Sequence, residues 1–288
     1  MELSIVNNRC KVCNRTNFSQ DLFDISTQTC LECKPKERLF FELLEIGDKK
    51  QESKDFYGAI DDYSKALGQS PTNIEALNSR GNAKFQMSDF QGAIEDFTKV
   101  VELEPKTASA YYNRAFSYFN INEYRQAVQD FSKCLELDSA NDQAYSNRGI
   151  AKLFSGDNNS AIEDFLQAIS LNPKNTIAYY NLADLYFRMQ DFPKALESLD
   201  KILNIDPKFL LALELRGKLR HQLQDYQGAL EDYDTILELT PSNYEVLNNR
   251  GNIRFLMKDY AKAIIDFTKV IELEPRAAIA YYNRGFAR

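Results

Sequence analysis

Four cysteines near the start of the chain have a spacing typical of a metal site. Cys10, Cys13, Cys30 and Cys33 form the pattern C-x2-C-x16-C-x2-C, and each C-x2-C pair can supply two thiolates to a tetrahedral zinc ion. The surrounding segment has few apolar residues, so it needs a cross-link such as a bound metal ion in order to fold. We expect one zinc ion at these four residues. Paired disulfides or redox-active C-x2-C motifs are the alternatives, and a reducing compartment disfavours disulfides.

Outside this segment the chain offers little material for catalysis. His221 is the only histidine, and no nucleophile or carboxylate stands at a recognisable spacing from it. Cys134 is the only further cysteine. Its counterparts 34 residues before and after are Val100 and Ala168, so we expect a buried packing thiol. We therefore expect a protein that is not an enzyme.

Composition and charge narrow the function classes. The chain has 288 residues, of which 44% are hydrophobic and 27% charged, as in a folded protein. Its net charge of -7 disfavours general nucleic-acid binding, which needs clustered Lys and Arg. No run approaches the roughly 18 apolar residues of a membrane-spanning helix. The start, MELSIVNNRC, lacks the basic and apolar runs of a secretion signal. We expect a cytoplasmic protein that does not bind membranes.

A period of 34 residues runs through the chain from residue 40 without an insertion or deletion. A small residue recurs at this interval, as Gly47, Gly81, Ala115, Gly149, Ala183, Gly217, Gly251 and Gly285. Twelve residues after each of the first seven stands an Ala, and four residues after that Ala stands a large apolar residue. The Ala and the large residue share one helix face, and the small residue lets another helix approach closely. Each repeat is therefore expected to be a helix, a turn and a second helix.

Two further residue types that recur every 34 residues mark the ends of the helices. An acidic residue recurs in the turn, where it can cap the second helix, as Asp55, Asp89, Glu123, Asp157, Asp191, Asp225 and Asp259. A Pro stands 24 residues after the small residue in six of seven repeats. Because Pro cannot continue a helix but can begin one, we expect it to end one repeat and to start the next helix.

This pattern of recurring residues resembles the tetratricopeptide repeat, a 34-residue helix-turn-helix family with the pattern W-x2-L-G-x2-Y, then A-x3-F, then P. The resemblance covers residues 40–288. It implies an all-α fold, an α-solenoid whose repeats stack into a right-handed superhelix. Repeats 1 to 7 are residues 40–73, 74–107, 108–141, 142–175, 176–209, 210–243 and 244–277, followed by a partial repeat at 278–288. Residues 1–39 are expected to be a separate module that is similar to a zinc ribbon.

An Arg at position seven of the repeat varies together with an Asp at position 23. The pairs are Arg80 and Asp96, Arg114 and Asp130, Arg148 and Asp164, Arg216 and Asp232, and Arg250 and Asp266. Repeat 5 has Leu182 and Ser198 instead. We expect an ion pair between the two helices of repeats 2, 3, 4, 6 and 7, with a structural role. Pairing with the Arg of the following repeat leaves more mismatches.

The resemblance also implies a concave surface, made largely of first helices, that holds peptide segments of other proteins. The residues expected to bind peptide are Tyr112, Asn113, Phe116, Asn147, Tyr180, Asn181, Asn249 and Asn283. Each Asn amide offers a donor and an acceptor, so a row of them can pair with the backbone of an extended peptide. The alternative is that these amides only hydrogen-bond neighbouring helices.

The sequence therefore predicts a non-enzymatic scaffold that binds an extended, neutral or partly basic segment of a partner protein and carries one zinc ion. Two alternatives stay open. The first is a nucleic-acid-associated adaptor that acts through the zinc module, where six basic residues are interleaved with five acidic ones. The second is the regulatory part of a larger multidomain protein.

Overall fold

The computed structural model describes residues 23–24, 29–30 and 34–288, and the regular structure of this part of the chain is helical apart from one short strand pair. Strands β1 (Phe23–Asp24) and β2 (Thr29–Cys30) are antiparallel, with Phe23 opposite Cys30. The helices are α1 (Lys34–Glu52), α2 (Phe56–Gln69), α3 (Ile74–Gln86), α4 (Phe90–Leu103), α5 (Ala108–Asn120), α6 (Tyr124–Leu137), α7 (Asp142–Phe154), α8 (Asn158–Leu171), α9 (Thr176–Arg188), α10 (Phe192–Ile205), α11 (Leu210–Gln222), α12 (Tyr226–Leu239), α13 (Tyr244–Leu256), α14 (Tyr260–Leu273) and α15 (Ala278–Ala287). The expectation of an all-α fold is confirmed for residues 34–288.

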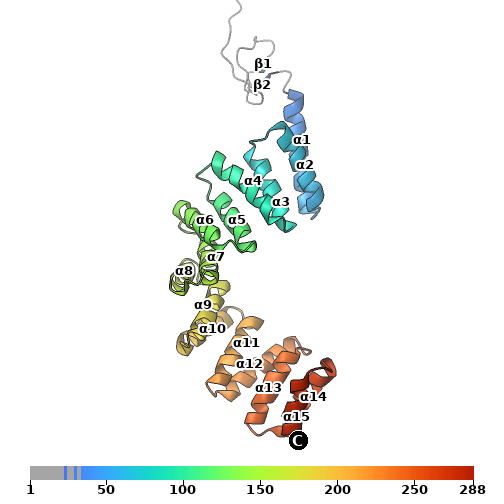
Figure 1. Ribbon diagram of the computed structural model, residues 1–288, viewed down its shortest axis with the longest axis vertical. Coiled ribbons are helices and arrows are strands. Elements are labelled where there is room, and N and C mark those ends of the chain that lie inside the picture. The colour runs from blue at the N-terminus through green and yellow to red at the C-terminus, as the bar shows by residue number, and fades with distance from the viewer. Residues whose placement is uncertain (1–22, 25–28, 31–33) are drawn as a thin grey trace, which may run out of the picture. The chain divides into compact units, whose positions relative to one another are not determined.

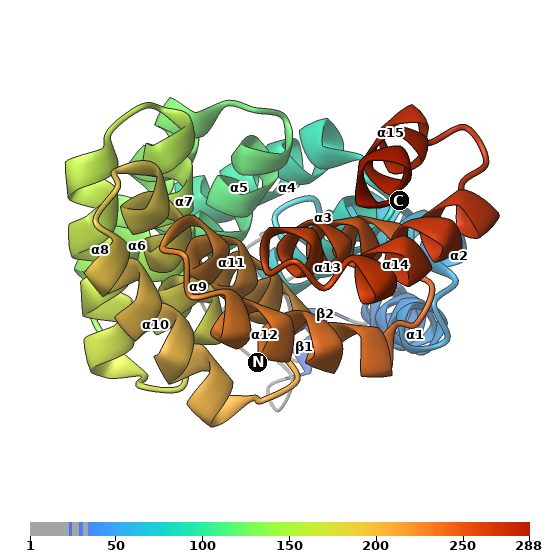
Figure 2. The same cartoon turned by 90° about the horizontal axis from the view of Figure 1, so that it is seen from below.

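The chain forms two compact units, residues 1–157 and residues 158–288, here called the N-terminal and C-terminal units. In the N-terminal unit α1 packs on α2, α3 on α4 and α5 on α6 (Figure 1). In the C-terminal unit α9 packs on α10, α11 on α12 and α13 on α14, and Figure 2 shows α13 and α14 side by side. These pairs are the predicted helix-turn-helix repeats. Among the described residues, no helix is both long and apolar enough to cross a membrane.

Small residues bring the two helices of a repeat into close contact. A Cβ atom on Gly81 would lie 2.8 Å from the Phe97 ring, and one on Gly251 would lie 2.7 Å from the Phe267 ring. Both rings are buried, as is Ala93 one turn before Phe97. The predicted contact between the small residue of the first helix and the large residue of the second is confirmed in these repeats.

The recurring acid caps the second helix, as predicted. A backbone N–H three residues further on donates a hydrogen bond to the side chain of Asp55, Asp89, Asp191, Asp225 and Asp259. Glu123 is the N-cap residue of α6 but accepts no such bond, in keeping with the preference of N-caps for the shorter Asp, Asn, Ser and Thr.

The turn between the two helices depends on one left-handed residue in each repeat. Position 15 has a positive φ in every repeat, as Lys54, Ser88, Asn122, Gly156, Gln190, Gln224 and Lys258. The next N–H then reaches back five residues, as from Asp89 N to Lys84 O at 2.9 Å, which satisfies a carbonyl at the end of the first helix. Gly156 is the only glycine at this position.

The expectation that Pro begins the next helix is wrong. Pro71 lies beyond the end of α2 at Gln69, and α3 begins only at Ile74. The side chain of Asn73 caps α3, because it accepts a hydrogen bond from the Ala76 N–H at 2.8 Å. Pro71 therefore stops the preceding helix, and Asn73, two positions later, starts the next one.

The predicted ion pairs are present in repeats 2, 3, 6 and 7. Arg80 donates to the two carboxylate oxygens of Asp96 from Nε at 2.9 Å and from Nη2 at 2.6 Å. Arg114 and Asp130, Arg216 and Asp232, and Arg250 and Asp266 make the same two-point contact. Their aspartates are buried. The pairing of Arg148 with Asp164 stays a prediction, because these residues belong to different units.

Further polar partners, which the sequence analysis did not identify, extend each ion pair into a network. A second cation at position eleven binds the same Asp in repeats 2, 6 and 7, as Lys84, Arg220 and Arg254. In repeat 1, which has Ile46 in place of the Arg at position seven, Lys50 binds Asp62. The Arg also reaches back to the preceding repeat. Arg80 Nη1 donates to Ser64 Oγ at 3.1 Å, and Arg250 Nη1 donates to Asp234 Oδ1 at 2.6 Å. Each of these Arg side chains therefore joins three helices.

Candidate functional site

Aromatic side chains form a continuous row in the N-terminal unit. This aromatic row consists of Phe85, Tyr112, Phe116, Phe119, Tyr124 and Phe154. The Phe116 ring centroid lies 5.4 Å from that of Phe85 and 6.4 Å from that of Phe119. The row continues to Phe154, whose ring centroid lies 5.7 Å from that of Phe119 and 5.0 Å from that of Tyr124. The rings come from α3, α5, α6 and α7, so the row crosses three repeats.

The aromatic row is accessible to a ligand. Phe154 is 61% exposed, and the other five rings are half-buried. Such a surface can bury apolar groups of a partner while the outer edges of the rings still contact water. Tyr112 also brings a hydroxyl group, whose pKa is raised because the side chain is partly buried, so the hydroxyl stays protonated and can act as a donor or an acceptor.

An aromatic pair inside most repeats builds this row. Position 17, directly after the capping acid, is aromatic in six of seven repeats, and it contacts the ring at position twelve. The pairs are Phe85 and Phe90, Phe119 and Tyr124, Phe187 and Phe192, His221 and Tyr226, and Phe255 and Tyr260. The 34-residue recurrence at position 17 is the signal that could have identified Tyr124 from the sequence. His221 is a ring partner of Tyr226, at a centroid distance of 6.0 Å.

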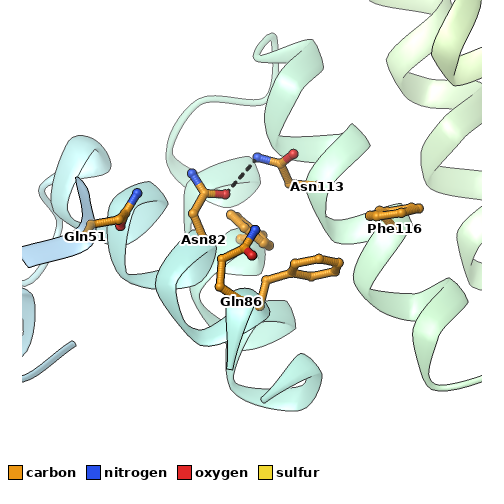
Figure 3. A pocket seen from close by; sticks show the side chains of 7 residues that line it. Gln51, Asn82, Gln86, Asn113 and Phe116 are labelled. Carbon is orange, nitrogen blue, oxygen red and sulfur yellow. Dashed lines mark hydrogen bonds between the residues drawn. The ribbon is translucent and has the colours of Figure 1, made fainter. Parts of the chain in front are cut away.

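A pocket of about 400 Å³ opens beside the aromatic row (Figure 3). It is lined by Gln51, Asn82, Phe85, Gln86, Phe97, Asn113 and Phe116. None of these seven side chains is ionisable. Figure 3 shows the amides of Gln51, Asn82, Gln86 and Asn113 together with Phe116, and Asn113 donates to Asn82 Oδ1 at 3.3 Å. The pocket therefore offers amide donors and acceptors beside aromatic faces, without a charge.

Four of the five predicted Asn residues make hydrogen bonds within the protein. Asn113 and Asn283 donate to the Asn of the preceding repeat, at 3.3 Å to Asn82 and 2.9 Å to Asn252. Asn147 donates to the Tyr112 hydroxyl at 2.8 Å, and Asn181 donates to the Ile177 carbonyl at 2.8 Å. An Asn amide has two donor hydrogens and two acceptor lone pairs. These single bonds therefore hold the amides in place and leave capacity for a ligand.

The predicted site residues fall into two groups. Tyr112, Asn113 and Phe116 on α5 and Asn147 on α7 lie together in the N-terminal unit, around the aromatic row. The other four, Tyr180, Asn181, Asn249 and Asn283, belong to the C-terminal unit. Phe85, Tyr124, Asn82 and the two glutamines of the pocket were missed, although they contact or line the same surface.

The corresponding surface of repeats 5 and 6, in the C-terminal unit, carries charge. On α9, Arg188 binds Asp184 at 2.7 Å, and on α11, Lys218 binds Glu214 at 2.5 Å. Asp184 and Lys218 occupy position nine, where repeats 2 and 3 have Asn82 and Phe116. Repeat 7 and the partial repeat instead form a second pocket without a charged side chain, of about 190 Å³, lined by Asn252, Phe255, Phe267, Tyr282, Asn283 and Phe286.

The predicted zinc site cannot be compared with the structure. Cys10, Cys13 and Cys33 lie outside the described residues, and Cys30 is described only through its place in β2. Within the described part of the chain, no group of three or more His, Cys, Asp or Glu side chains is arranged to hold a metal ion. Cys134 is buried, as predicted.

Family models of one kind match most repeats. A tetratricopeptide repeat model matches residues 152–219, a second matches residues 108–141 and 244–276, and a TPR repeat model matches residues 81–122. No curated protein sequence matches the chain.

Solved structures with the same fold support this assignment. The chain is 31% identical to MamA over 57% of its own length and 95% of that protein, with a TM-score of 0.55. A tetratricopeptide repeat protein from Parabacteroides merdae is 18% identical, with coverage of 87% and 99% and a TM-score of 0.64. YrrB, described as a TPR protein with an unusual peptide-binding site, is 23% identical, with coverage of 67% and 99% and a TM-score of 0.58.

Proposed function

Because this chain belongs to the tetratricopeptide repeat family, we propose that it is an interaction scaffold that holds an extended segment of a partner protein. The ligand is uncharged where it contacts the aromatic row, and it carries apolar or aromatic side chains. The peptide-binding site in the description of YrrB belongs to that protein. In this chain, the aromatic row and the amides beside it support peptide binding.

The aromatic row is the observation that supports this function. It is a partly exposed apolar surface without an ionisable group in its pocket, and a monomeric protein gains nothing from exposing such a surface to water. Aromatic rings bind apolar side chains, and the amides of Asn82 and Asn113 can pair with peptide N–H and C=O groups of any sequence. Charged segments are disfavoured, because they would lose hydration without gaining a partner.

Selection from a random-peptide display library on the full chain tests this proposal. We expect enriched peptides that are uncharged and rich in apolar residues. The double variant Phe116→Ala and Phe154→Ala should weaken the best synthetic peptide at least about tenfold in Kd, as expected for aromatic anchors. The matched control is Tyr57→Ala, which removes an aromatic side chain of α2 that is 77% exposed and does not belong to the aromatic row, and it should leave Kd unchanged. Equal loss in both variants would contradict the assignment to the aromatic row.

We also propose that residues 1–39 form a zinc-ribbon-like module with one zinc ion at Cys10, Cys13, Cys30 and Cys33. Its support is the spacing of the cysteines and the preference of zinc for thiolate ligands. The zinc would supply folding energy and no chemistry. Residues 40–288 would be the repeat array, and the cytoplasmic location stays a prediction.

A further inference from the structure

Repeat 5 lacks the whole polar network that joins the helices of repeats 2, 6 and 7. Leu182 replaces the Arg at position seven, Tyr186 replaces the second cation at position eleven, and Ser198 replaces the buried Asp. The change extends to the preceding repeat, where position 25 is Leu166. In the other repeats that position is polar, as Ser64, Thr98, Ser132, Asp200, Asp234 and Thr268. Four positions that line one pocket have therefore all lost the residue that takes part in the network.

Where the network is missing, the C-terminal unit has a pocket of about 350 Å³ between α8, α9 and α10. Leu166, Ile169 and Leu182 form much of its apolar lining. Leu182 is buried and Leu166 is 48% exposed. A structural exchange of an ion pair for apolar packing would bury both leucines. The exposed Leu166 instead leaves an apolar opening that is available to a ligand.

The ring face of Tyr179 adds to this opening. Tyr recurs at position four in Tyr111, Tyr145 and Tyr281, and in each case the guanidinium of the Arg three residues later lies 5.4 to 5.6 Å from the ring centroid. Tyr179 has Leu182 three residues later, so no such cation covers it. Its ring lines the pocket together with that of Tyr186.

The rim of the pocket, on α10, carries two lysines and one glutamate. Lys194 lies 5.2 Å from the Tyr186 ring centroid and binds Asp191 at 2.7 Å. Lys201, seven residues further along the helix, has no ion pair among the described residues. Glu197 lies between the two lysines in the sequence and also lines the pocket. The charge of Lys194 is paired with Asp191, but an ammonium group has three donor hydrogens, so both lysines can still bind a carboxylate at the ends of the rim. Glu197 disfavours a carboxylate in the middle.

We propose that this pocket docks an acidic segment of a partner protein, with one apolar side chain in the pocket and a carboxylate near each lysine. Lys194 and Lys201 are about 10 Å apart along the helix axis, from seven steps of about 1.5 Å. On a segment in the polyproline II conformation, with three residues per turn and about 3.1 Å per residue, two carboxylates three residues apart lie on one face and span about 9 Å. A small carboxylate cannot bridge both lysines. The segment therefore has the pattern acidic-x-x-acidic, with an apolar residue and no charge between the two acids.

This site shares no residue with the aromatic row, so neither proposal depends on the other. Lysine at position 26 is common to five of the seven repeats. The feature that distinguishes repeat 5 is the apolar pocket beside it. The variant that tests the proposal can be taken from the chain itself, because repeat 2 supplies a functioning network.

The variant Leu166→Ser, Leu182→Arg, Tyr186→Lys and Ser198→Asp copies the residues of repeat 2 and its preceding helix, Ser64, Arg80, Lys84 and Asp96. It should fill the pocket with an ion-pair network and keep the fold, which thermal unfolding checks. A second variant, Lys201→Glu, reverses one exposed charge without touching the core. Both variants and the wild-type full chain are presented to the same random-peptide library.

We expect the wild type to enrich peptides with the acidic-x-x-acidic pattern around an apolar residue. Their Kd should rise at least tenfold in the network variant and several-fold in Lys201→Glu, and it should not change in the Phe116→Ala and Phe154→Ala variant. The proposal is overturned if no such peptides are enriched, or if they bind the network variant as tightly as the wild type. It is also overturned if sedimentation experiments show that the pocket instead joins two copies of the chain, with a dimer formed by the wild type and not by the network variant.

Discussion

Arg250 and Asp266 form a buried two-point ion pair between α13 and α14. Arg250 donates to Asp266 from Nε at 3.1 Å and from Nη2 at 2.6 Å, and Arg254 adds a third contact at 2.7 Å. The Asp266 side chain is 1% exposed. Arg250 makes an equally short bond to Asp234, whose side chain is 50% exposed. One guanidinium thus binds a buried and an exposed carboxylate at the same distance.

This difference in burial predicts very different effects of two Asp→Ala substitutions. Asp266→Ala leaves two partly buried guanidinium groups without their shared carboxylate, so unfolding free energy should fall by about 3–5 kcal/mol. Asp234→Ala removes an exposed partner and should cost less than about 1 kcal/mol. Urea unfolding of both variants measures the difference. Equal losses would show that burial does not set the strength of this network.

The left-handed turn residues predict opposite effects of Gly→Ala at two sites of the N-terminal unit. Gly156 has φ of +83° and open space around its Cβ position, so Gly156→Ala should destabilise by about 1 kcal/mol through backbone strain alone. Gly68 also has open space but lies in α2 without a positive φ, so Gly68→Ala should stabilise by about 0.5–1 kcal/mol. Urea midpoints of the two variants should move in opposite directions.

Burial makes Cys134 an unreactive thiol. Desolvation raises its pKa to about 11, so at pH 8 only about one thiol in a thousand is ionised, and the thiolate is the reactive form. We expect no modification of Cys134 by iodoacetamide in the folded chain and rapid modification in urea, as read by peptide mass spectrometry. Fast labelling of the native chain would contradict the buried position.

The Asn residues of the aromatic row predict a local effect on peptide binding. Asn113→Ala together with Asn147→Ala should weaken the selected apolar peptides, because these amides lie beside Phe116 and Tyr112. Asn181→Ala is the control, since Asn181 lies in the C-terminal unit and bonds its own helix. The measurement is peptide Kd by fluorescence polarisation. An equal effect of Asn181→Ala would move the site away from the aromatic row.

The cysteine spacing predicts about one zinc ion per chain. Metal analysis of the purified chain should find it, and Cys10→Ser with Cys13→Ser should remove it while the helical signal of residues 34–288 stays. The same preparation tests the nucleic-acid alternative. RNA or DNA binding by the wild type that weakens steeply with salt and is lost with the zinc would favour that alternative.

The sequence alone determined the repeat and most of its local structure. Gly81 and Phe97 stand at a fixed spacing, so their contact follows from helix periodicity and the need for close approach. Asp89 was expected to cap the second helix because the capping interaction spans three residues. Positions seven and 23, occupied by Arg80 and Asp96 in repeat 2, lose their charges together in repeat 5, and this identified their pairing. The physical reason is that a buried charge without its partner is costly.

Only the tertiary structure decided which surfaces are continuous. Phe85 and Phe116 are 31 residues apart in the chain, and their stacking depends on how α3 and α5 lie in successive repeats. In the same way, Leu166 and Leu182 come from two repeats, and each alone resembles an ordinary apolar substitution. A period of 34 residues fixes what each helix presents. The distance between side chains on different repeats depends on helix packing, and that packing created the aromatic row and the pocket of repeat 5.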